Sequence, residues 1–252
     1  MTATIASPAA RPGGEGPAPR LSVVMPAYNE AGNIEAAVAD VVAHVFRVVP
    51  DAEMLVVDDG SRDATGAIAA ACGRRDQRIR VVAQANAGHG PALVRGMREA
   101  RGDFLLLLDS DRQIGLLDFD QTWRLAQQHD AVLGVRRDRA DPRYRLVLSA
   151  VVRGVMAAVL GVRSSDPNVP YKLVRRDRAL DAVCAMPDDP RIPSILLTVH
   201  LARRGVSTVE QPVQHFERAA GESTLKFMRL ARFCAAALGE LLRFHRSIGS
   251  RP

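Results

Sequence analysis

Short apolar runs recur along the first half of the chain, and each is followed by a stretch with helical character. The runs are continuous and rich in Val and Leu, which is typical of strands buried on both faces of a sheet. They lie at 21–26 (LSVVMP), 53–59 (EMLVVDD), 78–84 (RIRVVAQ), 103–109 (DFLLLLD) and 130–135 (DAVLGV). This rhythm predicts an α/β fold with a mostly parallel, Rossmann-like sheet and crossover helices.

The stretches between the runs predict the crossover helices themselves. They cover about 31–48, 63–75, 89–101 and 118–129. Asp63 and Asp118 stand where the N-caps of two of these helices are expected. Four successive βα units of this length are typical of a doubly wound half.

The rhythm changes after residue 136. A basic loop leads into an apolar helix, a turn-rich segment at 164–171, two expected helices and a late strand at 206–213. From about residue 222 the chain is helical and basic. We therefore expect a disordered leader without a secretory signal, one domain with two halves, and a basic amphipathic helical tail. The corresponding ranges are 1–20, 21–222 (halves 21–136 and 137–222) and 223–252.

The composition indicates the compartment of the protein and the kind of partner that it binds. A chain of 252 residues with 47% hydrophobic residues can bury a large core. Its three cysteines are far apart and lack the spacing of a metal site or a redox pair, which favours a reduced, cytoplasmic compartment. No apolar run reaches the length of a membrane-spanning helix. The net charge of +6 indicates an anionic partner, and the 4% aromatic content disfavours nucleic acid as that partner.

Polar residues follow the ends of the first four expected strands. In open parallel sheets, ligands bind beyond the carboxyl ends of the strands, so these residues are expected to lie at one edge. They are PAYNE (26–30), DDGS (58–61), NAGHGPA (86–92) and DSDRQ (109–113). The first of these lacks the G-x-G-x-x-G fingerprint, which disfavours NAD or FAD binding.

The last segment places two carboxylates one residue apart. Asp109 and Asp111 would point the same way in extended backbone, and two close carboxylates are stable only with a proton or a cation between them. Gln113 adds a neutral oxygen at the next alternate position. Such oxygen ligands suit Mg²⁺ or Mn²⁺, completed by water and nucleotide phosphates. The simpler alternative is that the acids only cap a helix or solvate a turn, as Asp58 and Asp59 also could before Gly60.

Taken together, the motifs PAYNE, VVDDGS, N-x-G-x-G-x-A-x-x-x-G (86–96) and LDSDRQ resemble the inverting glycosyltransferases of family 2, which have the GT-A fold. The second half is similar to dolichyl- or polyprenyl-phosphate sugar (mannose or glucose) synthases. That similarity rests on VLGVRR, the pair Arg145 and Ser149, DPNVPYKLVRR (166–176) and R-x-x-G-x-S (218–223). The resemblance covers about residues 21–228 and implies that 21–136 binds the nucleotide sugar and 137–222 the acceptor.

The resemblance also implies roles for individual residues. The donor nucleotide would be held by Pro26, Ala27, Tyr28, Glu30, Asp109 and Ser110, with Asp58 at the base. The metal would be held by Asp109, Asp111 and Gln113, with Asp111 nearest the diphosphate. Arg136 and Arg145 would act with Asp111 in catalysis by meeting the diphosphate or the acceptor phosphate. The acceptor-binding site would be formed by Ser149, Arg218 and Ser223.

These roles predict a metal-dependent transfer of a hexose from GDP-mannose or a UDP-hexose to polyprenyl phosphate. The helix at 193–205 contains no Asp or Glu to act as a base, only His200, and a phosphate acceptor needs none. Two alternatives remain open: a soluble acceptor with the same donor, or a nucleotide-sugar-binding protein without turnover.

Two features depart from those synthases. Lys172 stands where they frequently have Arg, and the transmembrane C-terminal helices of many of them are missing. Contact with the inner face of the membrane would then fall to the helix at 146–162 or to the tail at 224–247, which mixes Phe, Leu and Met with Arg. The alternative is that the tail packs on the domain and shows its Arg side chains to solvent.

Overall fold

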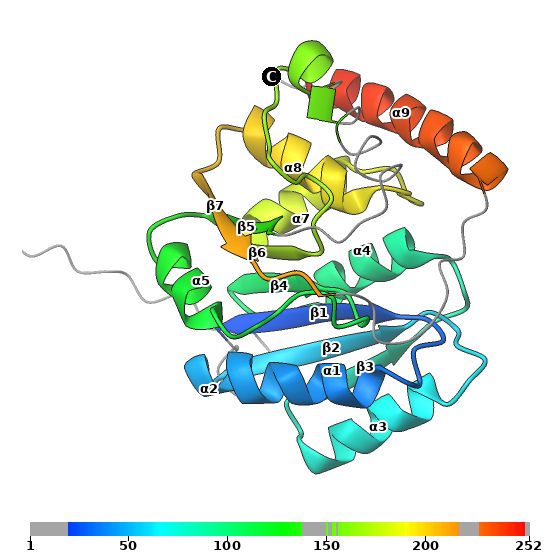
Figure 1. Cartoon of the computed structure of the whole chain (residues 1–252), viewed down its shortest axis with the longest axis vertical. Coiled ribbons are helices and arrows are strands. Elements are labelled where there is room, and N and C mark those ends of the chain that lie inside the picture. Colours follow the sequence, from blue (N-terminus) through cyan, green and yellow to red (C-terminus); the bar gives the residue numbers. More distant parts are fainter. Residues whose placement is uncertain (1–19, 138–149, 151–152, 155, 217–226, 250–252) are drawn as a thin grey trace, which may run out of the picture.

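A seven-stranded sheet runs through the centre of the computed structural model, with helices on both faces (Figure 1). The structure describes residues 20–137, 150, 153–154, 156–216 and 227–249. The strand order is β3-β2-β1-β4-β6-β5-β7. The strands are β1 (Leu21–Ala27), β2 (Ala52–Asp58), β3 (Ile79–Ala83), β4 (Phe104–Leu108), β5 (Ala131–Arg136), β6 (Tyr171–Arg175) and β7 (Thr208–Val213).

One strand runs against the others. β6 pairs antiparallel with both β4 and β5, and Lys172 lies opposite Leu107 on one side and Leu133 on the other. All other pairs in the sheet are parallel. Because β6 lies between β4 and β5, strands from both halves of the sequence form one sheet.

The helices form two layers. One face of the sheet is covered by α1 (Ile34–Asp40), η1 (Val41–Val45), α2 (Phe46–Val48) and α3 (Thr65–Arg75), and α5 (Phe119–Ala126) packs on η1 and α2. The other face is covered by α4 (His89–Glu99), α7 (Arg176–Ala185), α8 (Pro193–Arg203) and α9 (Phe227–Gly249). The segment η1 is a π-helix, which joins α1 to α2 without a break in the chain direction.

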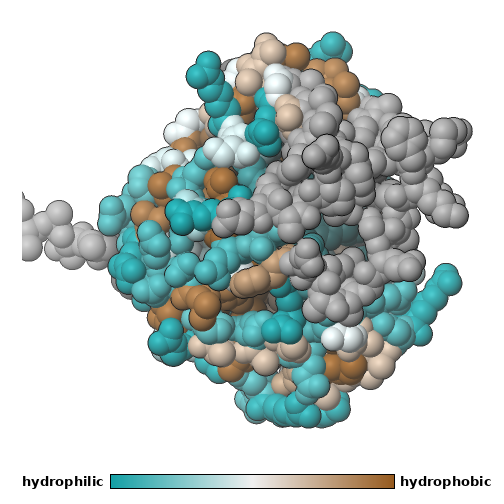
Figure 2. Space-filling model, in the orientation of Figure 1, coloured by the Kyte–Doolittle hydropathy of each residue, from teal (hydrophilic) through white to brown (hydrophobic). Residues whose placement is uncertain are grey.

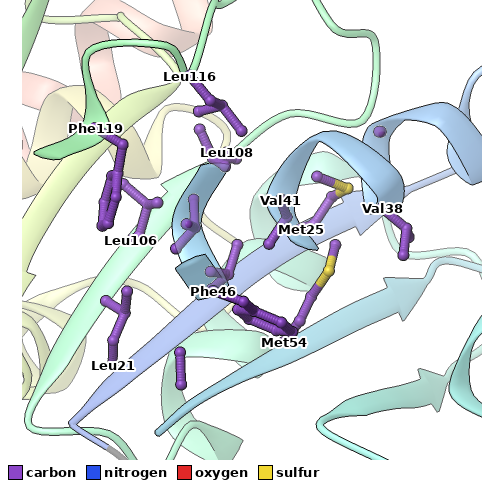
Figure 3. Close-up of a cluster of buried hydrophobic side chains, with 14 of the residues drawn as sticks. Leu21, Met25, Val38, Val41, Phe46, Met54, Leu106, Leu108, Leu116 and Phe119 are labelled. Carbon is purple, nitrogen blue, oxygen red and sulfur yellow. The ribbon is translucent and has the colours of Figure 1, made fainter. Parts of the chain in front are cut away.

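Each face of the sheet buries its own hydrophobic cluster. Figure 3 shows Met25, Met54 and Leu106 of the strands packed against Val41 and Phe46 of the first helical layer. The alternate residues of the same strands belong to the second cluster, under α4, α7, α8 and α9. Burial on both faces explains why the strand sequences are continuously apolar.

The expected elements of the first half are confirmed within three residues at each end, and so are α8 and the late strand. The other helix expected before that strand corresponds to α7. Asp118 is the N-cap residue of α5, although its side chain makes no capping hydrogen bond. Asp63 lies one residue before the N-cap of α3, and its carboxylate accepts a hydrogen bond from the Thr65 N–H. The strand β6 was not predicted.

The C-terminal helix α9 packs on the second layer. Leu241, Phe244 and Ile248 are buried there, whereas Arg243 and Arg246 are exposed. The described surface in Figure 2 is mostly hydrophilic with scattered apolar groups. Within the described ranges, no helix combines the length and the apolarity needed to cross a bilayer.

Candidate active site

Three strand ends and the first turn of α4 enclose a cleft of about 380 Å³ at one edge of the sheet. The strands β1, β2 and β4 end side by side here because they are parallel neighbours. The cleft is lined by Pro26, Ala27, Tyr28, Glu30, Asp59, Asn86, Gly88, His89, Ala92, Asp109, Ser110 and Asp111. The structure therefore brings together the polar ends of four of the expected elements, including all the residues expected to hold the donor except Asp58.

The loops after β1 and β2 hold each other in place. Asn29 has a φ of 54°, a left-handed conformation that Asn tolerates, and its side-chain oxygen accepts a hydrogen bond from the Arg62 N–H at 2.8 Å. The Ser61 hydroxyl accepts from the Asn29 N–H at 3.0 Å, and the Thr65 hydroxyl accepts from the Glu30 N–H at 2.8 Å. These bonds fix the backbone on which Tyr28 and Glu30 reach the cleft.

Asp59 anchors the loop that leads into α4. Its carboxylate is buried and accepts hydrogen bonds from the Gln84 side-chain amide at 2.6 Å, the Ala87 N–H at 2.9 Å and the Gly88 N–H at 2.8 Å. Gly60, next in sequence, has a φ of 69°, and a Cβ there would lie 2.7 Å from a backbone nitrogen of this loop. The close approach of the two loops therefore requires glycine at this position.

Asp58 is not among the residues that line the cleft. One of its carboxylate oxygens accepts a hydrogen bond from the Ser61 N–H at 3.0 Å, and the other lies against Gly66 of α3. Its expected role at the base stays a prediction, whereas Asp59 is a lining residue that the sequence did not single out. Neighbouring residues at a strand end point to opposite sides, so the pair of acids indicated that one of them would face the cleft.

The two acids after β4 lie at the floor of the cleft. Burial raises the pKa of Asp109, the His89 imidazole opposes this shift, and the charge of Asp111 adds to it. The Nε2 atom of His89 lies 3.7 Å from the Asp109 carboxylate. Asp111 accepts a hydrogen bond from the Gln113 N–H at 3.1 Å, which fixes the turn after the strand. A cation would relieve the repulsion between the two acids.

The turn itself is held from outside the cleft. Arg112 has a φ of 59°, and its guanidinium Nε donates to the Asp40 carboxylate at 2.8 Å. The side-chain amide of Gln113 lies 3.4 Å from the Phe216 carbonyl oxygen, and the Gln113 carbonyl accepts from the Phe216 N–H at 2.8 Å. Gln113 is not among the residues that line the cleft. Its role as a metal ligand stays a prediction.

The donor set fits a divalent cation that is shared with a nucleotide. In the described part of the chain, no group of three or more His, Cys, Asp and Glu side chains could hold a metal. Asp109 and Asp111 supply two carboxylates on one wall of a cleft wide enough for a ligand. Mg²⁺ usually takes one or two protein carboxylates and completes its shell with substrate phosphates and water. The two acids therefore suffice only if a diphosphate binds beside them.

Arg136 ends β5 beside a buried acid. Its Nε and Nη2 atoms donate to the two oxygens of Asp166 at 2.7 and 2.9 Å, and the two side chains are only 13% and 5% exposed. Such a forked pair fixes the guanidinium plane. The positive charge of Arg136 also lowers the pKa of Asp109, although less than burial raises it. Four other expected site residues lie outside the described residues: Arg145, Ser149, Arg218 and Ser223.

His200 is committed to another contact. It is buried in α8, and its Nε2 atom lies 2.8 Å from the carboxylate of Asp181 in α7. This hydrogen bond lowers the pKa of Asp181. His200 is not among the residues that line the cleft. The helix α8 thus supplies no acid, and its histidine packs between helices.

Comparison with known proteins decides the family. Residues 22–180 match the profile described as Glycosyl transferase family 2. The chain belongs to this family. Its GT-A fold agrees with solved structures of glucosyl-3-phosphoglycerate synthase from Mycobacterium tuberculosis. The structure with Mn²⁺, uridine diphosphate and glucosyl-3-phosphoglycerate has a TM-score of 0.67 at 21% identity and covers 90% of this chain and 80% of that one. The expected fold class and the family resemblance are therefore confirmed.

Curated relatives of this family 2 glycosyltransferase are longer proteins. Undecaprenyl-phosphate 4-deoxy-4-formamido-L-arabinose transferase from Aeromonas hydrophila subsp. hydrophila is 30% identical over 213 residues, which are 83% of this chain and 64% of the relative. The protein of the same name from Pseudomonas aeruginosa (strain LESB58) is also 30% identical, over 83% of this chain and 61% of the relative. The chain spans about three fifths of the length of these relatives.

Proposed function

We propose that this family 2 glycosyltransferase moves a hexose from a nucleotide diphosphate sugar to a polyprenyl phosphate, with Mg²⁺ or Mn²⁺ as its cofactor. The relatives named above support a polyprenyl phosphate acceptor, because their names state undecaprenyl phosphate. The pair Asp109 and Asp111 at the floor of the cleft supports a metal-bound diphosphate donor. GDP-mannose and UDP-hexoses are the donors that we propose.

The observation that carries the acceptor proposal is that no carboxylate among the described residues of the cleft is left over to act as a base. Among the described residues, the acids that line the cleft are Glu30, Asp59, Asp109 and Asp111. The first holds the Asn33 side chain, the second holds the loop before α4, and the last two are the proposed metal ligands. A sugar hydroxyl would need a general base to attack, but a phosphate monoester is already an anion near neutral pH.

The proposed reaction replaces one bond to the sugar by another. An oxygen of the acceptor phosphate attacks the anomeric carbon, and the bond from that carbon to the diphosphate oxygen breaks. The nucleoside diphosphate leaves with the bonding electrons, so attack from the opposite face inverts the configuration. The cation, when bound, neutralises charge on the diphosphate. Arg136, which is paired with Asp166, is the proposed guanidinium that meets the diphosphate or the acceptor phosphate.

The membrane is the proposed place of reaction, because the acceptor is a lipid. We propose that the protein binds peripherally at the cytoplasmic face, through anionic lipids. Arg243 and Arg246 on the exposed side of α9 support this, since exposed cationic side chains are attracted to an anionic surface. The apolar side of the same helix is used in packing on the domain.

A turnover assay tests the proposal. The purified protein is incubated with Mg²⁺ or Mn²⁺, a panel of GDP- and UDP-sugars and a short-chain polyprenyl phosphate, and the products are identified by mass spectrometry. We expect one nucleotide sugar to yield a glycosylated lipid phosphate, and chelation of the metal to stop the reaction. A thermal-shift panel with the same donors identifies the nucleotide independently, because a bound donor stabilises the folded state.

Two results would contradict the proposal. Absence of lipid product with every donor that binds would remove the polyprenyl phosphate. Transfer to a soluble acceptor, together with failure to float with anionic liposomes, would favour a soluble-substrate transferase instead.

A further inference from the structure

A lysine lies fully buried in the middle of the sheet. Lys172 is 1% exposed, and it lies opposite Leu107 and Leu133 in the interior strand β6. Lysine is almost never fully buried without partners, because its ammonium loses the solvation of water. Burial lowers the pKa of Lys172 to about 7. Because burial of an ammonium is unfavourable, Lys172 needs contacts that stabilise it in the fold.

The amino group of Lys172 has three hydrogen-bond acceptors. It donates to the Pro167 carbonyl at 2.9 Å, the Val169 carbonyl at 2.9 Å and the Ser194 hydroxyl at 2.5 Å. The Ser194 hydroxyl in turn donates to the Val169 carbonyl at 3.2 Å. An ammonium has three donors, so all of them are used and none is left for a ligand. Lys172 therefore holds protein, not substrate.

What it holds is the loop that carries Asp166. Pro167 and Val169 lie one and three residues after Asp166, and the Thr198 hydroxyl of α8 donates to the Pro167 carbonyl at 3.3 Å. The carboxylate of Asp166 accepts two hydrogen bonds from the Arg136 guanidinium. The loop is thus fixed to the sheet by Lys172 and to α8 by Ser194 and Thr198, while its first residue orients Arg136.

We propose that Lys172 is a positioning residue that fixes the 166–169 loop, so that Asp166 holds the Arg136 guanidinium in one orientation at the end of β5. The inference rests on the proposed function only for what Arg136 meets there, the diphosphate or the acceptor phosphate. Placement of Arg136 by the loop is a property of the protein alone. A cation that is misplaced by about 1 Å from a reacting phosphate can lower turnover on the order of 100-fold.

The first test measures Arg136 without any substrate. Phenylglyoxal modifies guanidinium groups that are free to move, and peptide mass spectrometry gives its rate at Arg136. We expect Lys172→Met to raise this rate several-fold, because the loop loses its anchor in the sheet. Ser194→Ala removes one of the three contacts and should raise the rate less. If Lys172→Met does not fold, Ser194→Ala decides the question.

A control variant separates positioning from general loss of stability. Thr122 is buried beside the same strand and shares hydrogen bonds with the Tyr171 hydroxyl at 2.6 Å and the Gln211 side chain at 2.7 Å. Thr122→Val removes these bonds but touches neither the loop nor Arg136. Arg136 should be modified at the wild-type rate in this variant, even if its melting temperature falls.

The second test uses turnover with the substrates identified above. Lys172→Met and Asp166→Asn should each lower kcat, about 100-fold at most. The double variant should lose no more than the worse single variant, because both act through Arg136. Lys172→Arg should recover part of the activity, since it restores cationic donors to the loop.

The outcomes separate this inference from the proposed function. Wild-type modification of Arg136 in folded Lys172→Met or Ser194→Ala, or losses that multiply in the double variant, would overturn the positioning role. If no lipid phosphate is glycosylated but Arg136 becomes more reactive in Lys172→Met, the acceptor proposal fails and the positioning role stands.

Discussion

The two acids after β4 share a motif but differ in surroundings. Asp109 lies near His89 and has a raised pKa because of burial, whereas Asp111 is tied to the turn through the Gln113 N–H. Two carboxylates this close repel each other, so a cation between them would stabilise both. The two acids thus line one cleft in different surroundings.

Asp111→Asn should remove most of the activity. The change keeps the shape of the side chain but halves the negative charge available to the cation, and we expect turnover to fall by about 100-fold or more. Titration of Mn²⁺ in the presence of the nucleotide diphosphate should show weaker binding. Asp120→Asn is the matched control, because this exposed acid pairs with Arg124 on α5 and does not line the cleft. Equal activity of the Asp111→Asn variant and the wild type would contradict the metal role.

The pH dependence of stability should report the buried amine. Burial lowers the pKa of Lys172 from 10.5 to about 7. Between these values the unfolded chain binds the additional proton, so the free energy of unfolding rises with pH in that window. Lys172→Met lacks this titration, and the wild type should therefore gain stability relative to the variant from pH 7 toward pH 10. Urea denaturation at about pH 6.5, 8 and 9.5 measures the difference, and a constant difference would contradict the shift.

The elements of the first half could be predicted because their strands are buried on both faces. Leu106 packs under the first helical layer and Leu107 under the second, so the run shows no alternation and stands out from the helices. β6 was not predicted because its sequence is not a continuous apolar run. It follows a turn-rich segment, and Lys172 in its centre is polar in sequence although buried in the fold.

The sequence allowed us to predict which strand ends form the site. It did not allow us to predict which side chains at those ends line the cleft. The motif VVDDGS indicated an acid at the cleft, yet only the packing of Asp58 against α3 shows that Asp59 is the lining residue. In the same way, the sequence revealed an unusual lysine at position 172 but not the loop that it binds. These facts depend on contacts between segments far apart in the chain.

The start of α4 depends on a glycine packed against the segment before α8. A Cβ on Gly90 would lie 1.6 Å from the Pro190 carbonyl oxygen. Gly90→Ala must therefore move His89 or the 187–192 segment, and we expect about 1–3 kcal/mol lower stability and weaker nucleotide binding. Gly154→Ala is the control, because a Cβ there would lie within 4 Å of no atom of the described residues. Calorimetry of nucleotide binding and urea denaturation test both variants, and wild-type values for Gly90→Ala would contradict the packing.

At the scale of the whole molecule, α9 reaches the cleft indirectly. Glu240 is 3% exposed and accepts two contacts from the Arg191 N–H, at 3.0 and 3.2 Å. The neighbouring Pro190 packs on Gly90 at the beginning of α4. The outermost helix is therefore connected to the wall of the cleft by one short segment.

Glu240→Ala should loosen that segment. The Arg191 N–H would lose its acceptor, and we expect the free energy of unfolding to fall by about 1–3 kcal/mol. Hydrogen exchange of residues 187–192 should become faster than in the wild type. Arg243→Ala, on the exposed side of the same helix, should leave the exchange unchanged. Unchanged exchange in Glu240→Ala would show that α9 does not restrain the segment.

The insertion of β6 between β4 and β5 has a consequence for recombination. β5 is encoded in the first half of the chain, yet its only strand neighbours, β6 and β7, come from the second half. A gene fragment that stops after residue 136 would thus encode a strand without its partners. Chimeras that exchange everything after that point between related enzymes must match every cross-strand contact of β6. New acceptor preferences are more readily transplanted as surface loops than as whole halves.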